Sequence, residues 1–327
     1  MHAPRTRVQR RPVHGVLLLD KPLGLSSNQA LQKAKWLLRA EKAGHTGTLD
    51  PLASGVLPLC FGAATKFSQL HLEADKTYET TVRLGVRTST GDAEGDVVQT
   101  QPVTCTVGQV VEVLDRFTGP ITQVPPMHSA LKKDGKPLYA YARDGEEVER
   151  APRAVVIHDL ELLDMQLDGE APHIRLRVCC SKGTYIRTLG EDIALALGCG
   201  GHLTALRRVA TGGFDASRCI SLSALEALEE PSRLAALLPV QTLLEGHERV
   251  TLGAEDAARF LSGLRRRGPW ADSARVAVYG PPTDESAQEP VLLGTAHVQA
   301  GELIPGRLLS PTDIRQIQET SRETATS

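Results

Sequence analysis

Asp50 is the residue of this chain whose type and setting point most directly to chemistry. It precedes Pro51, which biases its backbone toward an extended conformation, and glycines at positions 44, 47 and 55 stand close by. A carboxylate held on a stiffened loop can act as a nucleophile, a base or a ligand. It can also accept backbone hydrogen bonds in an Asx turn, and the residue types alone favour this structural interpretation.

Tyr185 and Arg187 stand where an expected strand gives way to an expected helix. Apolar and polar side chains alternate over residues 174–181, which is typical of a strand with one buried face. A turn follows, and Thr188 with Glu191 predicts the capped start of a helix. Side chains at such a junction can point into a cleft, so Tyr185 and Arg187 are candidate site residues.

The motifs of several common kinds of site are missing from the sequence. Its 10 histidines form no HExxH pattern and no Cys/His set at zinc spacing, and there is no Walker A, GxGxxG or GxSxG motif. Asp92, Glu94 and Asp96 resemble a fragment of a calcium loop, but the later ligands are lacking, which favours a solvated turn. We therefore expect neither a metal nor a cofactor.

The elements that must position these residues fall into two expected domains, since the 327 residues are about twice a typical domain of roughly 150. We expect a basic N-terminal arm (1–14), a large first domain (15–240) and a small β-rich module (249–312). Residues 119–153 mix proline, glycine and charge, which predicts a long, loop-rich and mobile insertion. The polar tail (313–327) is expected to be frayed.

Two capping boxes predict helices in the first half of the chain. Ser26 with Gln29 precedes an apolar stripe at helical spacing, and Thr106 with Gln109 precedes a second one that runs to about Phe117. Between these helices the residues from Tyr78 onward alternate as a strand does.

Composition narrows the class of protein. Hydrophobic residues make up 41% of the chain and charged residues 23%, which is ordinary for a globular protein and excludes a disordered or fibrous one. No apolar run approaches the roughly 18 residues of a membrane-spanning helix, and the N-terminus has no apolar block typical of a secretory signal. The 6 cysteines form no CxxC pair, so we expect free thiols in a reducing cytoplasm.

The charge of the chain is unevenly distributed. A net charge of −2 gives no global sign of a nucleic-acid partner, but basic residues outnumber acidic ones over residues 1–45. Arg207–Arg208 and Arg265–Arg267 form two compact clusters. Such clusters can present a phosphate-binding face, although scattered solvated side chains explain the pattern equally well.

Six segments closely resemble, in order, those of the TruB family of tRNA pseudouridine synthases. They are GHTGTLDPLASGVLPL (44–59), DKTYETTVRLG (75–85), TSTGDAEG (88–95), SALKKDGKPLYAYAR (129–143), CSKGTYIRTLGEDIA (180–194) and HLTALRR (202–208). Small departures from the family's pattern are Ser54, Gly201 and the adjacent pair Cys179–Cys180, and none of them carries chemistry. The C-terminal stretch is similar to the PUA-type RNA-binding module that follows the synthase domain in this family.

The resemblance implies isomerisation of uridine 55 in the T-loop of tRNA, without a cofactor. By its place in GHTGTLD, Asp50 corresponds to the family's catalytic aspartate, and Arg187 to the arginine that pairs with it. Tyr78 matches the tyrosine that stacks on the target base, Tyr185 a second site tyrosine and Leu206 an apolar wall of the pocket. A tyrosine or leucine beside a strand is otherwise usually part of the core.

RNA contacts are implied for a second set of residues. The resemblance places His45 against the RNA or in the space that the flipped nucleotide vacates. Candidates for contact with the RNA backbone are Lys132, Lys133, Lys136, Arg207 and Arg208. For the lysines, a solvated loop is the structural alternative. Arg265–Arg267 would fit contact with the acceptor stem, or form a plain surface run.

The implied fold is α+β: a pseudouridine-synthase-type mixed, largely antiparallel sheet with flanking helices, plus a small C-terminal β-rich PUA-like domain. The implied partner is the T-arm of tRNA, with no membrane and no required protein partner, in a cytoplasmic monomer. Two rivals are a guide-RNA-dependent pseudouridine synthase that acts on other RNA and a non-catalytic RNA-binding or RNA-folding protein. Whether Asp50 attacks C6 of the base or C1′ of the sugar stays open.

Overall fold

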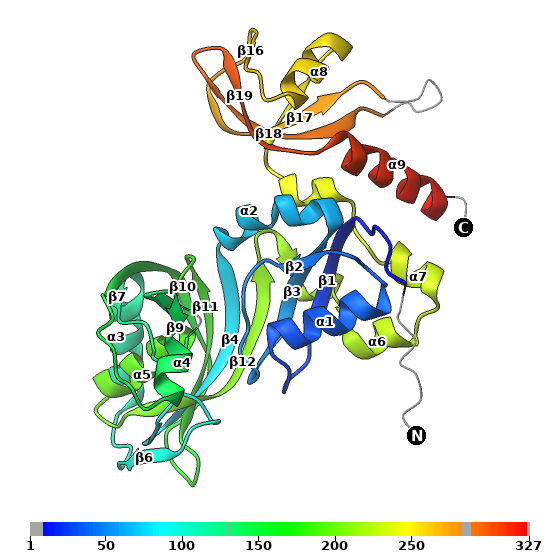
Figure 1. The fold of residues 1–327 in the computed structure, drawn as a ribbon. Helices are drawn as coiled ribbons and strands as arrows, with labels where there is room; N and C mark the ends of the chain where they lie inside the picture. Colours follow the sequence, from blue (N-terminus) through cyan, green and yellow to red (C-terminus); the bar gives the residue numbers. More distant parts are fainter. Residues whose placement is uncertain (1–8, 130, 283–288, 326–327) are drawn as a thin grey trace, which may run out of the picture.

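A large mixed sheet and a smaller five-stranded sheet organise the protein (Figure 1). The computed structural model describes residues 9–129, 131–282 and 289–325. The ten strands of the large sheet within these ranges are β1 (Gly15–Lys21), β2 (Ala43–His45), β3 (Ala53–Phe61), β4 (Lys76–Leu84), β7 (Gly119–Gln123), β10 (Arg153–Gln166), β11 (His173–Cys180), β12 (Gly201–Thr211), β13 (Phe214–Asp215) and β14 (Ile220–Ser221). The smaller sheet contains β15 (Glu248–Thr251), β16 (Arg266–Arg267), β17 (Ser273–Gly280), β18 (Val291–Gln299) and β19 (Glu302–Leu308).

The remaining elements are helices and two short strand pairs. The strand pairs are β5 (Val86–Thr88) with β6 (Val97–Thr100), and β8 (Lys132–Lys133) with β9 (Lys136–Pro137). The α-helices are α1 (Ser27–Leu37), α2 (Ser68–Leu72), α3 (Val107–Phe117), α4 (Leu138–Arg143), α5 (Ile186–Ala196), α6 (Leu222–Ala227), α7 (Glu230–Ala235), α8 (Ala254–Leu261) and α9 (Pro311–Ala325). The 3₁₀ helices are η1 (Gly62–Lys66), η2 (Ala216–Arg218) and η3 (Val240–Leu244).

The large sheet has the order β14-β1-β3-β12-β4-β11-β10-β7, with β2 on β3 and β13 on β12. Only the β1–β14 and β3–β12 pairs are parallel among the described strands of this sheet. Strands β4 and β12 lie at its centre, between the half that carries α1 and α6 and the half that carries α3 and α5 (Figure 1). This arrangement confirms the predicted α+β fold with a mixed, largely antiparallel sheet.

The helix caps show where local sequence decides the structure. Ser26 and Thr106 form the capping boxes predicted for α1 and α3. The cap predicted for α5 from Thr188 and Glu191 is wrong, because the helix begins earlier, with Tyr185 as its N-cap and no side-chain cap of its own. A side chain far away in sequence takes that role.

Gln123 of β7 supplies the missing cap. Its Oε1 accepts a hydrogen bond from the Tyr185 backbone N–H at 3.0 Å, and its Nε2 donates to the Tyr185 carbonyl at 3.3 Å. Gln123 is only 2% exposed, so this amide pair is protected from water. The first residues of the insertion 119–153 are thus an ordered edge strand, whereas the sequence predicted a loop-rich segment throughout.

Both faces of the large sheet are buried at β1. Leu17 and Leu19 belong to a core under the helices, while Val16 and Leu18 belong to a second core on the opposite face. The second core continues into the C-terminal module, where it includes Phe260. The β-rich module predicted at the C-terminus is therefore confirmed, and it shares an apolar core with the large sheet.

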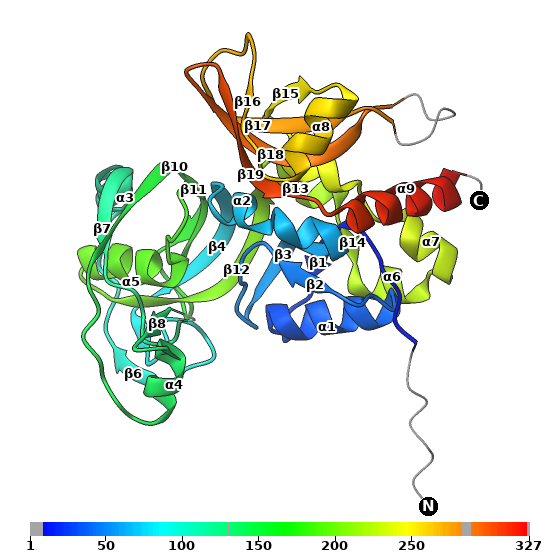
Figure 2. The same cartoon turned by 45° about the horizontal axis from the view of Figure 1, so that its top comes forward.

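Helix α9 corrects the prediction of a frayed tail. The chain after β19 forms this helix, which returns to the large sheet and packs against η1 and α7 (Figure 2). Lys66 Nζ lies 2.9 Å from Asp313 Oδ2, which also accepts a hydrogen bond from Ser310 Oγ. His14 Nε2 bonds Gln316 Oε1 at 3.1 Å. Ile314 belongs to the second core and Ile317 packs against it, but the rest of the helix is mostly polar, which is why composition alone suggested fraying.

Removing the Asp313 carboxylate is expected to loosen the docking of α9. Burial raises the pKa of Asp313, but Ser310 and Lys66 outweigh that effect and hold it at about 2. Because this pKa is below the usual value near 3.8, the carboxylate's stabilisation is present above about pH 4 and is lost as the pH falls through 2. Asp313→Asn should cost on the order of 1–2 kcal/mol at pH 7, allowing for partial solvent screening.

Hydrogen exchange of the α9 amides measures this directly. Exchange should be faster in Asp313→Asn than in the parent protein at pH 7, and the difference should shrink toward pH 2. Equal exchange in the two proteins at pH 7 would contradict the role of this ion pair.

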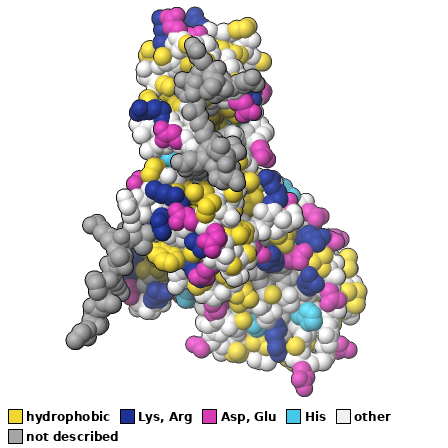
Figure 3. Space-filling model, turned by 90° about the vertical axis from the view of Figure 1, so that its right-hand side faces the viewer, with side chains coloured by type: hydrophobic (Ala, Val, Ile, Leu, Met, Phe, Trp, Pro, Cys, Tyr) yellow, Lys and Arg dark blue, Asp and Glu magenta, His cyan; other side chains and the backbone are white. Residues whose placement is uncertain are grey.

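The surface of the molecule carries mixed charge. On the face drawn in Figure 3, basic and acidic side chains are interspersed rather than segregated. In the part of the chain that the structure describes, no helix has the length and apolar character needed to cross a membrane.

Candidate active site

The loop that carries Asp50 is fixed on both sides of the residue. It connects β2 to β3, which pair as an antiparallel hairpin. The Leu49 N–H donates to Ser27 Oγ at 2.7 Å, and the Ser27 hydroxyl lies 3.1 Å from the Leu49 carbonyl. On the other side, the Gly24 N–H donates to the Pro51 carbonyl at 2.9 Å. The loop is therefore held by the start of α1 and by the turn before it, as the stiffened setting of Asp50 predicted.

Gly55 allows β3 to approach β12. Its φ is +104°, and a Cβ at this position would lie 2.2 Å from the Arg208 carbonyl oxygen. No other residue fits there without moving the backbone, because the contact is with main-chain atoms. This close parallel pairing brings Leu206 of β12 alongside Ala53 of β3, near the end of the Asp50 loop.

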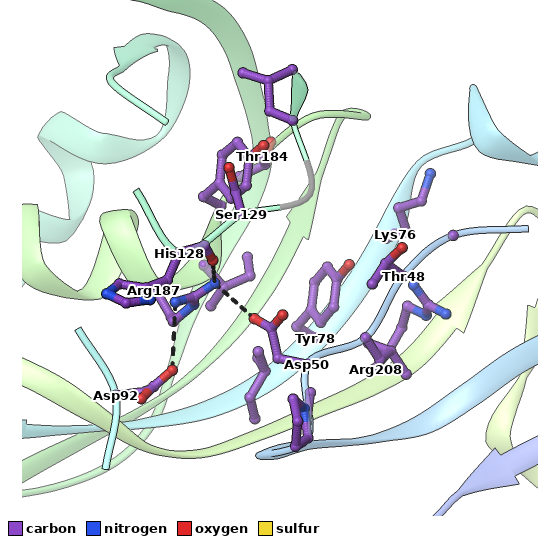
Figure 4. Close-up of a pocket in the computed structure, with 18 of the residues that line it drawn as sticks. Thr48, Asp50, Lys76, Tyr78, Asp92, His128, Ser129, Thr184, Arg187 and Arg208 are labelled. Carbon is purple, nitrogen blue, oxygen red and sulfur yellow. Dashed lines mark hydrogen bonds and ion pairs between the residues drawn. The ribbon is translucent and has the colours of Figure 1, made fainter. Parts of the chain in front are cut away.

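Arg187 is the centre of a network of hydrogen bonds and ion pairs (Figure 4). Its Nη2 lies 2.9 Å from Asp50 Oδ2 and donates to the His128 carbonyl at 2.6 Å. Its Nη1 donates to the Thr90 carbonyl at 3.1 Å and lies 3.6 Å from Asp92 Oδ2. The Arg187 side chain is 7% exposed, whereas that of Asp50 is 40% exposed and lines a cavity. The buried guanidinium therefore orients an acid that remains open to a ligand.

Asp92 corrects the interpretation of its segment as a solvated turn. Its side chain is 4% exposed, and Oδ1 accepts hydrogen bonds from Thr90 Oγ1 at 2.6 Å and from the Glu94 N–H at 3.1 Å. Burial, together with the Asp92 and Asp50 carboxylates, raises the pKa of Glu94. Arg187 thus lies between two carboxylates, and the sequence signal for the second was its place in TSTGDAEG.

The cavity beside Asp50 has a volume of about 700 Å³. Tyr78, Tyr185 and Leu206 line it together with Asp50 and Arg187, so the structure brings these five predicted residues to one place. Burial raises the pKa of Tyr78, and the Arg208 guanidinium acts against that rise. Within the described ranges, no three His, Cys, Asp or Glu side chains gather closely enough to hold a metal ion.

His45 and the two arginines of β12 differ in their exposure and in their partners. His45 is in β2 and is not among the residues that line the cavity, and burial lowers its pKa. Arg207 forms a bidentate pair with Asp20 at 3.0 and 2.9 Å. Arg208 is only 1% exposed but lines the cavity, so its predicted contact with the RNA backbone would lie inside the cavity. Strand alternation turns Arg208 inward where Arg207 faces out.

The three candidate lysines of the insertion lie at the β8–β9 hairpin. Lys133 Nζ donates to the Glu149 carbonyl at 2.9 Å, and Lys136 Nζ pairs with Asp144 at 2.5 Å. Lys132 is exposed. An RNA phosphate must therefore compete with an acidic partner at Lys136. In the C-terminal module, Arg265 and Arg267 pair with Glu302, which offsets much of that basic run.

Sequence patterns gave no signal for several groups that build the site. Ser27 anchors the loop, Gln123 caps α5 and the His128 carbonyl accepts from Arg187, yet each acts through a contact distant in sequence. Such contacts depend on how strands are ordered in the sheet, which periodicity does not reveal.

Comparison with known proteins gives matches over nearly the whole chain. The profile described as "TruB family pseudouridylate synthase (N terminal domain)" matches residues 35–186, and "tRNA pseudouridylate synthase B C-terminal domain" matches residues 187–245. The chain is 64% identical over 318 residues to tRNA pseudouridine synthase B of Verminephrobacter eiseniae, covering 96% of this chain and 94% of that one. It is 60% identical over 304 residues to tRNA pseudouridine synthase B of Ralstonia nicotianae, covering 92% and 95%.

The fold also resembles that of a solved structure with lower sequence identity. A chain of a Cbf5-Nop10-Gar1 complex superposes with a TM-score of 0.67 at 27% identity, covering 92% of this chain and 86% of the other.

Proposed function

Because the chain belongs to the TruB family of pseudouridylate synthases, we propose that it converts uridine to pseudouridine in the T-loop of tRNA, at position 55. The observation that carries the proposal is the Asp50–Arg187 ion pair at the wall of a cavity that Tyr78 and Leu206 also line. Relatives that are 64% and 60% identical are named tRNA pseudouridine synthase B, which favours tRNA over other RNA.

The reaction fits the groups that this cavity presents. Pseudouridine formation breaks the N1–C1′ bond and forms a C5–C1′ bond, while C5 loses a proton and N1 gains one. Nothing is oxidised and no group leaves, so the step needs a nucleophile or an anionic stabiliser rather than a co-reactant. The exposed oxygen of Asp50 supplies that group, and Arg187 fixes its direction. The ring of Tyr78, whose residue is 8% exposed, offers an apolar surface to the base.

A uridine in a folded loop must leave its stack before it can enter this cavity. Flipping costs a few kcal/mol, which contacts with phosphates and with the shape of the loop must supply. The insertion with its exposed Lys132 and the β-rich C-terminal module, which we take to be a PUA-like RNA-binding domain, supply such contacts in the proposal. In the proposal the protein is cytoplasmic and acts as a monomer, without a protein partner.

Binding of tRNA is expected to order the insertion and protect it from proteolysis. Among the described residues between β7 and β10, the insertion contains two short strands and the helix α4, and it has exposed lysine and arginine residues after which trypsin cuts the backbone. Limited proteolysis with and without unmodified tRNA should show cleavage in this segment slowed several-fold by tRNA. Equal cleavage rates in the two samples would count against an ordering of this segment by RNA.

Mapping the modified nucleosides of an unmodified tRNA transcript after treatment with the purified protein tests the proposed function. We expect one new pseudouridine, at position 55, and tritium release from a transcript labelled at C5 of uridine. Modification at other positions alone would point to a different RNA target. Tight binding without any pseudouridine would support a non-catalytic RNA-binding protein.

A further inference from the structure

Three buried cations near the cavity form no ion pair with a carboxylate among the described residues, although Asp50 raises the pKa of Lys21 and Asp75 that of Lys76. Lys21, Lys76 and Arg208 are 0%, 9% and 1% exposed. The ion pairs nearest the site belong instead to Arg187 and Arg207. A buried charge is costly unless another charge and hydrogen bonds compensate it, so this cluster is incomplete in the protein alone.

Backbone oxygens accept the hydrogen bonds of the two lysines, and Arg208 also interacts with the Tyr78 hydroxyl. Lys21 Nζ donates to the carbonyls of Pro22 and Leu25, and Lys76 Nζ to those of Leu72 and Ala74.

Arg208 is the least satisfied of the three. Its Nε donates to the Val56 carbonyl at 2.7 Å, but its Nη2 is buried and has no acceptor. A guanidinium with a free N–H donor is suited to an anion with several oxygens.

Two of the cations line the same cavity as Asp50. Figure 4 shows Lys76, Thr48 and Arg208 together on one side of Tyr78, while Asp50, Arg187 and Asp92 lie on the other. The cavity therefore has an acidic end at its ion-pair network and a cationic end beyond the tyrosine.

We propose that Arg208 and Lys76, with the Thr48 hydroxyl, form an anion subsite of this cavity whose occupant is a phosphodiester group of the RNA strand that delivers the target nucleotide. The proposal rests on the proposed function, because a nucleotide with its base beside Asp50 carries its phosphates into the same cavity. A phosphodiester supplies both the missing negative charge and oxygens for the free donor of Arg208.

The pKa of Lys76 is consistent with a site for an anion. Burial, followed by the Arg208 guanidinium, lowers the pKa of Lys76 to about 8, while Cys180 and Asp75 act in the opposite direction. An anion bound between the two cations raises the pKa of Lys76 and so opposes the effect of Arg208.

Single-phosphate neutralisation of a T-arm stem-loop tests the subsite. Each loop phosphate is replaced in turn by an uncharged methylphosphonate, and the Kd is measured in an Asp50→Asn background that prevents turnover. We expect one or two positions next to the target nucleotide to weaken binding about 10- to 100-fold, as for loss of a charged hydrogen bond. The same positions should have little further effect in proteins that also carry Arg208→Gln or Lys76→Gln.

Two matched variants complete the experiment. Arg207→Gln changes the outward-facing neighbour of Arg208. In this variant, methylphosphonates at those positions should weaken binding as much as they do in the parent background. Gln at position 208 can still donate to the Val56 carbonyl, and Lys76→Gln provides an independent measurement if Arg208→Gln does not fold. In Arg208→Gln and in Lys76→Gln, the slope of log Kd against log salt concentration should also decrease by about the amount expected for one lost phosphate contact.

The outcomes separate this proposal from the proposed function. If the methylphosphonate penalties are additive with both Arg208→Gln and Lys76→Gln at every position, the subsite is refuted, even when the parent protein forms pseudouridine. If the parent protein forms no pseudouridine in any tRNA transcript, the proposed function fails first. Loss of the penalty at the same one or two positions in both variants supports the subsite.

Discussion

Replacing Asp50 by asparagine is expected to abolish pseudouridine formation while leaving RNA binding nearly unchanged. The amide has the same shape but carries no negative charge, so it is neither a nucleophile nor a partner for a cationic intermediate. Loss of a reacting group of this kind costs about 10⁴-fold or more in turnover. The loop should keep its position, because Ser27 holds the backbone at Leu49 independently of the carboxylate.

Single-turnover tritium release and filter binding on the same transcript measure both quantities. Asp115→Asn, on the exposed surface of α3, is a matched control in which both quantities should stay unchanged. Turnover by Asp50→Asn within tenfold of the parent protein would falsify the assignment of Asp50 as the reacting group.

Removing the Arg187 guanidinium is expected to cost stability as well as activity. Arg187→Met leaves the buried Asp92 carboxylate without its cation, and breaking a buried pair in this way costs about 3–5 kcal/mol. The second substitution Asp92→Asn should recover much of this loss, because the Asn oxygen can still accept from Thr90 and from the Glu94 N–H. Activity should not recover, since Asp50 still lacks its partner.

Urea unfolding of the four proteins of this cycle gives the coupling energy directly. Arg187→Met should be the least stable, and the double variant should lie clearly above it. If the loss in unfolding free energy of the double variant equals the sum of the losses of the two single variants, Arg187 and Asp92 do not act as a pair. A double variant with normal turnover would show that orientation of Asp50 does not depend on Arg187.

Local sequence predicted the parts of the fold that local contacts determine. The capping boxes at Ser26 and Thr106 begin helices where predicted, because a cap is a contact between residues three apart. The α5 cap failed for the opposite reason: Gln123 is 62 residues from the backbone that it holds. Helix α9 was missed because it is polar and is docked by partners such as Lys66, far away in sequence.

The site was predictable to the extent that the family resemblance named its residues. Asp50, Arg187, Tyr78, Tyr185 and Leu206 come from four separate motifs, and the sheet brings them to one cavity.

The family resemblance did not indicate which charged side chains of the site are buried. It gave no sign that Asp92 is buried against the same arginine, or that Arg208 faces inward. The interpretation of Asp92 as part of a solvated turn treated a charged residue as exposed by default, which is right for most charged side chains and fails where they build a pocket.

The hydrogen bond from Arg187 to the His128 carbonyl connects the insertion directly to the arginine that orients Asp50. The same Nη2 serves both oxygens, at 2.6 Å to His128 and 2.9 Å to Asp50. A substrate that displaces residue 128 changes the acceptors that share this donor, so binding of RNA by the insertion changes how firmly Arg187 orients the Asp50 carboxylate. Binding of RNA by the insertion and orientation of the Asp50 carboxylate are therefore coupled through one donor atom, Arg187 Nη2.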